Sequence, residues 1–343
     1  LYLYLPFAHT KSMKKTVDFW ENLQGCSALA ARLDLAIEAN ALLRGTANIE
    51  IPGVAEEVQQ SSGVIIHIIT VLDERGEEAL HRPQGKYITL DIPPVENEET
   101  IADIASVAAK QLSSLLPVTG TFSRPILVVG LGNNNAIPDA LGPRVIDLTY
   151  ATRHIFQNGQ KPAGLAPVCT IAPGVLGNSG IETAEIIMGI CEHIHPAALI
   201  VVDSLAAASV TRVGTTIQIS DTGIKPGSGI GNRRNGIDED MAGCPVIAIG
   251  VPTVVDTASI ISETVKSLDR YWEGKAQLFP TKIDEGACQF AEKQLLERFR
   301  GRLMVTPKDI DELIADDAEI IASAIAITIH PGADKNNYHD FIR

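Results

Sequence analysis

The chain has 343 residues, of which 45% are hydrophobic and 20% are charged, and its formal net charge is −14. This length and composition are typical of a globular protein with a sizeable core. The negative charge argues against a surface for nucleic acid or anionic membranes, because contacts with phosphate need clustered Lys and Arg. We therefore expect neither nucleic acid nor a membrane as a partner.

No apolar stretch approaches the roughly 20 residues that a membrane-spanning helix needs. The five cysteines are scattered and show no Cys-x-x-Cys spacing. This usage is typical of reduced thiols in a cytosol-like compartment and argues against a disulfide framework or a zinc cage. We expect a cytoplasmic protein that needs no cofactor and no metal.

The first third of the chain is predicted to contain a leader and a strand-rich lobe. Residues 1–34 show no clear hydrophobic period and are predicted to be a leader. Strands are predicted at 64–72 and 86–92, within a lobe at about 45–95, because both runs are rich in β-branched residues. Helical spacing of apolar residues then predicts a helix over 101–116.

From residue 125 onward, predicted strands and helices alternate, which is typical of an α/β domain. The predicted strands are 126–130, 167–172, 198–202, 215–219 and 245–250, and the predicted helices are 141–156, 180–194, 255–270 and 307–327. The sequence thus predicts a mostly parallel sheet flanked by helices. The main sheet, at about 120–330, belongs to a single domain of 35–343.

Two acidic residues follow two of these predicted strands. Asp139 lies in the loop after the apolar run 126–130, and Asp203 comes directly after 198–202. Ligands of parallel α/β sheets gather outside the carboxyl ends of the strands, so both carboxylates are expected at one edge. Two carboxylates in one cleft can share a proton and act as acid and base. The alternative, that each aspartate caps the following helix, stays open.

Three basic residues and one further acid are weaker candidates. The glycine-rich loop 220–234 is either a solvated turn or a flap whose Lys225, Arg233 or Arg234 holds an acidic group of a substrate. Glu182 lies at the start of the predicted helix 180–194, where it favours the positive helix N-terminus or serves as a third carboxylate.

The tripeptide Asp221-Thr222-Gly223 matches the active-site motif of pepsin-like peptidases. Those enzymes need two copies in an all-β frame, whereas this α/β chain has one. We interpret the tripeptide as a turn in which Gly223 takes a positive φ angle.

Longer segments carry a more specific signal, and they are PDALGPR, APGVLGNSGIET, VVDSLAA, TIQISDTGIKPGSGIGNRR, PVIAIGVPTVVD and LMVTPKDID. This set resembles the germination proteases of spore-forming bacteria, from about residue 33 to residue 330. The resemblance implies an endopeptidase that degrades small acid-soluble spore proteins during germination, in the spore core. It also implies a homotetramer and a fold similar to the hydrogenase-maturation peptidases.

The resemblance places the family's two catalytic aspartates on Asp139 in PDALGP and on Asp203 in VVDSLAA. Which of the two is base and which is acid stays open, because a coupled pair titrates as a unit. The family is made as a zymogen, and an acid followed by a large apolar residue, Ala, any residue and Glu resembles its cleavage site. This pattern predicts processing between Asp34 and Leu35; the alternative is that Asp34 and Glu38 are an ordinary charged pair near a short helix.

Two other functions stay open on sequence grounds. A metal-dependent peptidase on the same scaffold would use Asp139 and Asp203 as ligands, with Asp256 as a third. A non-catalytic protein would capture acidic-apolar peptides through the glycine-rich loop.

Overall fold

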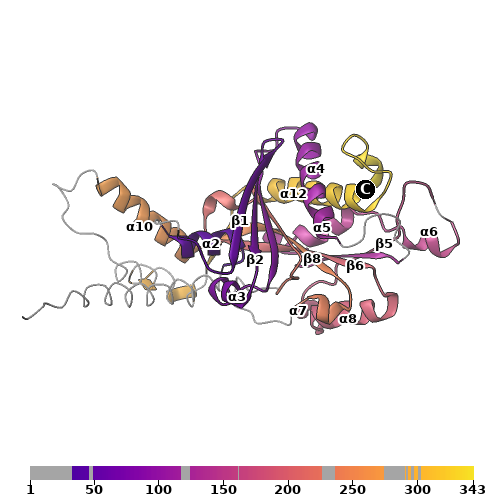
Figure 1. Cartoon of the computed structure of the whole chain (residues 1–343), viewed down its shortest axis with the longest axis horizontal. Coiled ribbons are helices and arrows are strands. Elements are labelled where there is room, and N and C mark those ends of the chain that lie inside the picture. The colour runs from indigo at the N-terminus through magenta and orange to yellow at the C-terminus, as the bar shows by residue number, and fades with distance from the viewer. Residues whose placement is uncertain are drawn as a thin grey trace, which may run out of the picture.

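The computed structural model in Figure 1 describes residues 33–45, 49–116, 124–160, 162–225, 236–273 and 303–343, and a few positions between 290 and 299. The leader before residue 33 and the candidate residues Arg233 and Arg234 lie outside the described residues. No helix within the described ranges is long and apolar enough to cross a bilayer.

The described part of the chain is organised around one sheet of nine strands. In chain order they are β1 Val54–Ser61, β2 Val64–Val71, β3 Gly85–Asp91, β4 Ile126–Gly130, β5 Val168–Ile171, β6 Ala198–Ala207, β7 Thr216–Ser220, β8 Val246–Asp256 and β9 Met304–Val305. The spatial order is β1-β2-β3-β7-β8-β6-β4-β5, and β9 pairs with β8.

The sheet is mixed, and β8 is the strand at which its direction changes. On one side, β8, β6, β4 and β5 pair in parallel. On the other side, β7, β3, β2 and β1 add antiparallel strands. The predicted α/β class is confirmed. The sheet was expected to be mostly parallel, but it is mixed, and its parallel part is formed by β4, β5, β6 and β8 alone.

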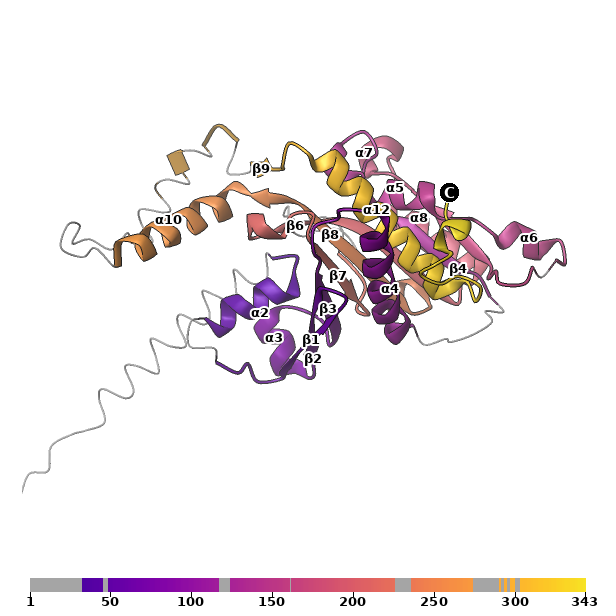
Figure 2. The ribbon, with the colours of Figure 1, turned by 90° about the horizontal axis from the view of Figure 1, so that it is seen from above.

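The helices form layers on both faces of the sheet. They are α2 Ala36–Arg44, α3 Glu74–Leu80, α4 Glu98–Leu115, α5 Leu141–Leu148, α6 Arg153–Gln157, α7 Leu176–Ser179, α8 Thr183–Ile194, α9 Glu239–Ala242, α10 Thr257–Glu273 and α12 Ile310–Ile329. Figures 1 and 2 show α4, α5 and α12 together on one face, with α3, α7 and α8 on the other.

The two faces bury different apolar clusters. The face under α4, α5 and α12 holds one large cluster that includes Ile200, Ile217 and Ile249. The opposite face carries two smaller clusters, one under α2 and α3 and one under α8 and α9. The stretch of sheet between these two smaller clusters is the place where polar side chains face a cavity.

Two elements of the N-terminal part differ from the sequence-based expectation. β1 was not predicted, because its edge strand VAEEVQQS is exposed along almost its whole length and has no apolar alternation. The second is α3: the charged stretch Asp73-Glu74-Arg75-Gly76 after β2 was expected to be a turn between two strands, and it is the start of a helix. There the carboxylate of Asp73 accepts hydrogen bonds from the N–H groups of Arg75 and Gly76, which caps the helix.

Candidate active site

A cavity of about 520 Å³ lies on the face of the sheet that carries α2, α3 and α8. It is lined by the ends of parallel strands, by the antiparallel strands β3 and β7, and by the chain entering α2. The lining residues that matter most below are Asp34, Arg82, Asp139, Asp203, Leu205 and Gln218. The structure therefore brings Asp139 and Asp203 to one cavity.

Asp203 lies within β6, and its side chain is held at the cavity wall. The preceding residues of β6 are fully buried between β4 and β8, which fixes the strand in the sheet centre. Asp203 itself is 7% exposed, and its Oδ1 accepts a hydrogen bond of 2.9 Å from the N–H of Ser204. A buried carboxylate with fixed orientation is a suitable acid or base.

Asp139 reaches the same cavity from the loop after β4. This loop ends in a short 3₁₀ turn, Ile137–Asp139, in which the Asp139 N–H donates to the carbonyl of Ala136 at 2.7 Å. The loop is tied to β8, because the Thr253 hydroxyl donates to the carbonyl of Pro138 at 2.6 Å. Asp139 is half-buried, so its position depends on the loop rather than on a strand.

The loop can take this path only with glycine at position 132. Gly132 has a φ of 112°, and a Cβ built there would lie 2.1 Å from the carbonyl oxygen of Asp139. That carbonyl also accepts a hydrogen bond of 2.9 Å from the N–H of Asn133. Gly132 therefore lets the backbone of Asp139 pack directly on the end of β4.

Asp203 and Gln218 lie in one row across three strands. Asp203 on β6 pairs with Gly250 on β8, and Gln218 on β7 pairs with the same glycine. Residues paired across strands point to the same face, so both side chains face the cavity. A Cβ at Gly250 would lie 2.4 Å from the Leu205 side chain, which fills the space above the glycine.

The chain at the predicted processing site enters this cavity. Leu33 and Asp34 line it, and the Arg82 guanidinium donates a hydrogen bond to the carbonyl of Leu33. The Gln218 amide group donates to the carbonyl of Asp34 at 3.2 Å and accepts from the N–H of Ala36 at 2.7 Å. Gln218 thus holds the carbonyl oxygen of the Asp34–Leu35 peptide bond itself and the N–H of the peptide bond that follows it.

The side chains at this peptide bond are also held. The Asp34 carboxylate accepts a hydrogen bond of 2.9 Å from the N–H of Ala206. Leu35 is fully buried in the cluster that contains Tyr87 and Leu205. Burial lowers the pKa of Arg82, against the opposing effects of Tyr87 and the nearby carboxylates.

The weaker candidates differ in their position. Lys225 lines the cavity at an exposed position. Glu182 does not line it; it precedes α8, next to the lining residue Thr183, and makes no capping hydrogen bond through its side chain. Gly223 of the pepsin-like tripeptide has a φ of 74°, which confirms the predicted turn.

Sequence reasoning did not find Gln218 or Arg82. Gln218 sits in a strand of alternating pattern, where a polar residue is expected on an exposed face. Arg82 follows a helix whose existence was not predicted. Among the described residues, no group of three or more His, Cys, Asp and Glu side chains is placed to hold a metal ion.

Comparison with known proteins decides the family. Residues 29–296 match the model of the germination protease family, Peptidase_A25. The chain belongs to this family. It is 39% identical to the germination protease of Clostridium tetani over 92% of this chain and 100% of that protein. It is 38% identical to the germination protease of Clostridium acetobutylicum, over 91% of this chain and 99% of the relative.

Membership of the germination protease family makes the chain an endopeptidase of an atypical aspartic class that acts in spore germination. Among solved structures, the chain is similar to the [NiFe] hydrogenase maturation protease HycI from Thermococcus kodakarensis. The TM-score is 0.30 and the identity 14%, over 63% of this chain and 98% of that one.

Proposed function

We propose that this germination protease starts the degradation of small acid-soluble spore proteins, and that it is made as a zymogen that cleaves itself between Asp34 and Leu35. One observation carries the proposal: Gln218 holds the Asp34–Leu35 peptide in the cavity that Asp139 and Asp203 line. The enzyme works in the cytoplasm of the forespore and in the spore core.

Asp139 and Asp203 activate water for attack on the scissile carbonyl carbon. One carboxylate takes a proton from the water, while its protonated partner donates a hydrogen bond to the carbonyl oxygen. The new C–O bond forms a tetrahedral intermediate, and the C–N bond then breaks as a proton passes to the leaving nitrogen. The products are a carboxylate at Asp34 and a free amine at Leu35.

The contacts around the bond support cleavage after an acid and before a large apolar residue. The Ala206 N–H binds the Asp34 carboxylate, and the pocket that buries Leu35 favours an apolar side chain. An apolar residue placed there gains about 1.5–3 kcal/mol from burial. A substrate with the same pair of residues fits the same contacts.

The test is the processing of the full-length chain, followed by mass spectrometry of the new N-terminus. We expect the wild-type chain to begin at Leu35 after incubation, while Asp139→Asn and Asp203→Asn slow this cleavage by at least about 100-fold. Asp221→Asn, in the pepsin-like tripeptide, is the matched control and should process normally, because an amide oxygen still accepts from the Lys86 N–H. Full processing by either dyad variant would refute the assignment.

The processed enzyme is then incubated with a purified small acid-soluble spore protein, with and without a strong chelator. Cleavage after an acidic residue that ignores the chelator supports the two-aspartate peptidase. Cleavage that is lost with the chelator and restored by a divalent ion would support the metal-dependent alternative. Tight binding without cleavage would support the non-catalytic binder.

The family resemblance also leads us to propose a homotetramer. Light scattering after size-exclusion chromatography gives the mass directly, and a mass near that of one 36.7 kDa chain would contradict it.

A further inference from the structure

The amide group of Gln218 contacts the carbonyl oxygen that becomes charged when the peptide bond is attacked. Its nitrogen donates to the Asp34 carbonyl oxygen at 3.2 Å, and this carbonyl belongs to the peptide bond between Asp34 and Leu35. When water adds to the carbonyl carbon, the π electron pair of the C=O bond moves onto this oxygen, and it returns when the C–N bond breaks. The Gln218 amide is therefore in contact with a reacting atom.

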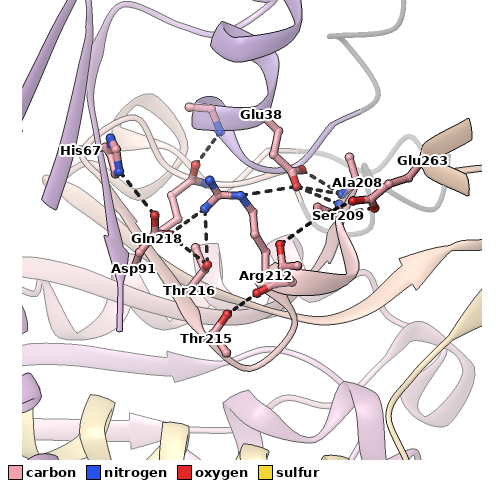
Figure 3. Close-up of polar contacts among 12 residues, drawn as sticks. Glu38, His67, Asp91, Ala208, Ser209, Arg212, Thr215, Thr216, Gln218 and Glu263 are labelled. Atoms are coloured by element: carbon pink, nitrogen blue, oxygen red, sulfur yellow. Dashed lines mark hydrogen bonds and ion pairs between the residues drawn. The ribbon is translucent and has the colours of Figure 1, made fainter. Parts of the chain in front are cut away.

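The orientation of the Gln218 amide is fixed by its second hydrogen bond. The Ala36 N–H can only donate, so the oxygen of the amide has to face it, and the two atoms lie 2.7 Å apart. Figure 3 shows the Gln218 side chain extending from β7 towards the start of α2, where this contact is made. The amide nitrogen therefore faces the Asp34 carbonyl and needs no rotation when charge develops there.

The backbone of Gln218 is held on both sides by neighbouring strands. β7 pairs with β3 through Thr89 and with β8 through Gly250, so Gln218 lies within the sheet. Asp203 pairs with the same Gly250 from β6, which places Gln218 and Asp203 in one row along the cavity. The donor and one candidate acid–base group are thus positioned by the same rigid sheet.

The hydrogen bond from Gln218 suits a charged oxygen better than a neutral one. In the uncleaved chain its length of 3.2 Å lies at the upper end of the range for N–H···O hydrogen bonds, about 2.7–3.2 Å. Hydrogen bonds to a negatively charged acceptor are shorter and roughly twice as strong. The bond therefore strengthens as the tetrahedral intermediate forms, which is the condition for lowering the barrier.

We propose that Gln218 is a catalytic residue that stabilises the negative charge developing on the scissile carbonyl oxygen, beside the hydrogen bond from the protonated aspartate. This inference rests on the proposed function. The oxygen has two lone pairs, so it accepts from both groups. Both contacts of Gln218 are with main-chain atoms, so the residue acts in the same way on an external substrate.

The test compares two uncleavable analogues of the peptide of residues 31–42. In one, a ketomethylene group (CO–CH2) replaces the Asp34–Leu35 bond, and its carbonyl stays trigonal. In the other, a difluoroketone (CO–CF2) takes up water and forms a tetrahedral diol that resembles the intermediate. The enzyme is the full-length chain after self-processing, and the measured quantity is the ratio of the two inhibition constants against cleavage of the unmodified peptide.

We expect the wild type to prefer the difluoroketone by at least about 100-fold, and Gln218→Leu to reduce this preference by about 10-fold or more. The lost contact with the Ala36 N–H weakens both analogues equally, so it cancels in the ratio. Gln218→Leu is incubated for longer, so that its slower self-processing is complete. If it stays unprocessed, Gln218→Asn, whose amide lies one methylene further from the carbonyl, gives the same comparison.

Arg82→Gln is the matched control, because Arg82 holds the Leu33 carbonyl, which does not react. We expect it to weaken both analogues by the same factor and to leave the preference within about threefold of the wild type. An unchanged preference in the Gln218 variant, or an equal loss in both variants, would overturn the catalytic role while self-processing by the wild type upholds the proposed function. Failure of the wild type to process itself and to cleave the unmodified peptide would instead overturn the proposed function, and this inference with it.

Discussion

Gln218 and Asp203 pair with the same residue, Gly250, from opposite sides of β8. Asp203 belongs to the parallel half of the sheet and Gln218 to the antiparallel half. The candidate acid–base group and the group that holds the peptide backbone therefore meet where the sheet changes direction. Because Gly250 has no side chain, the side chain of Leu205 occupies the space above it.

Gln218→Leu should slow self-processing without unfolding the chain. The leucine leaves the Asp34 carbonyl and the Ala36 N–H without their partner, which costs about 1–3 kcal/mol of binding for the correctly placed peptide. This corresponds to a rate lower by roughly 10- to 100-fold. The rate is measured from the loss of the full-length band on a denaturing gel.

Thr89→Val is the matched control for this variant. Thr89 pairs with Gln218 from β3 and is fully buried, and its hydroxyl has no hydrogen-bond partner among the described residues. We expect normal processing by Thr89→Val. Equal slowing by both variants would mean that the region tolerates no change, and Gln218 would lose its positioning role.

Gly132→Ala should remove activity and lower the melting temperature. The new Cβ would meet the Asp139 carbonyl at 2.1 Å, and the φ of 112° is strained for alanine by about 1–3 kcal/mol. Relief of the clash moves Asp139 away from the cavity. Processing assays and thermal unfolding measure the two effects.

Gly177→Ala provides the comparison on the same side of the sheet. Gly177 lies in α7, and no atom of the described residues lies within 4 Å of the position that a Cβ would take there, so alanine fits without strain. We expect unchanged processing and equal or slightly higher stability. Normal activity of Gly132→Ala would show that Asp139 does not need this tight loop.

The sequence could predict the parts of the fold whose burial is uniform. The apolar runs of β4, β6 and β8 are buried on both faces, so their hydrophobicity alone marks them as strands. The residues of the edge strand β1 are almost all exposed, so no alternation of apolar residues marks it as a strand. It forms because it pairs with β2, and this pairing cannot be seen in the sequence of β1 alone. α2 entered the sequence analysis only in the alternative reading, as a short helix near Asp34 and Glu38.

The candidate site divides in a similar way. Asp139 and Asp203 were found because strand ends in parallel sheets gather ligands. The expected position of Asp203 after a strand was wrong, because β6 continues to Ala207 and Asp203 lies inside it. Gln218 contributes through the antiparallel register of β7 with β8, and Arg82 through a contact with the Leu33 carbonyl, 49 residues earlier in the chain. Neither the strand register nor the contact between distant segments can be predicted from the local sequence.

His330→Asn should reduce the loss of unfolding free energy that the wild-type chain shows as the pH falls below 6.5. Burial lowers the pKa of His330 to about 4, from an ordinary value of 6.5. The unfolded chain therefore binds the proton more readily, and stability is lost as pH falls from 6.5 towards 4, by roughly 2–3 kcal/mol. Asparagine still accepts the Ala166 N–H bond, which measures 3.1 Å in the native chain, but does not titrate.

Urea unfolding at pH 7 and pH 4.5 measures this difference. His154→Asn, at an exposed position in α6, is the control and should keep the wild-type dependence on pH. A profile of His330→Asn as steep as the wild type would assign the acid sensitivity to other groups.

Asp317→Asn should stabilise the protein at neutral pH. Asp317 is 2% exposed in α12, and its Oδ2 has no hydrogen-bond partner among the described residues. Burial, and then the Asp316 carboxylate, raise the pKa of Asp317 well above its ordinary value of 3.8.

The folded chain thus holds a proton on Asp317 that the unfolded chain releases, so the unfolding free energy falls as pH rises above 3.8. Asparagine avoids this loss, and we expect a gain of about 1–3 kcal/mol in unfolding free energy at pH 7. The gain should be smaller at pH 4, where the unfolded chain also binds the proton part of the time. Asp316→Asn, at the half-exposed neighbouring position, should gain less. An equal gain at both pH values would mean that Asp317 acts through packing and not through its proton.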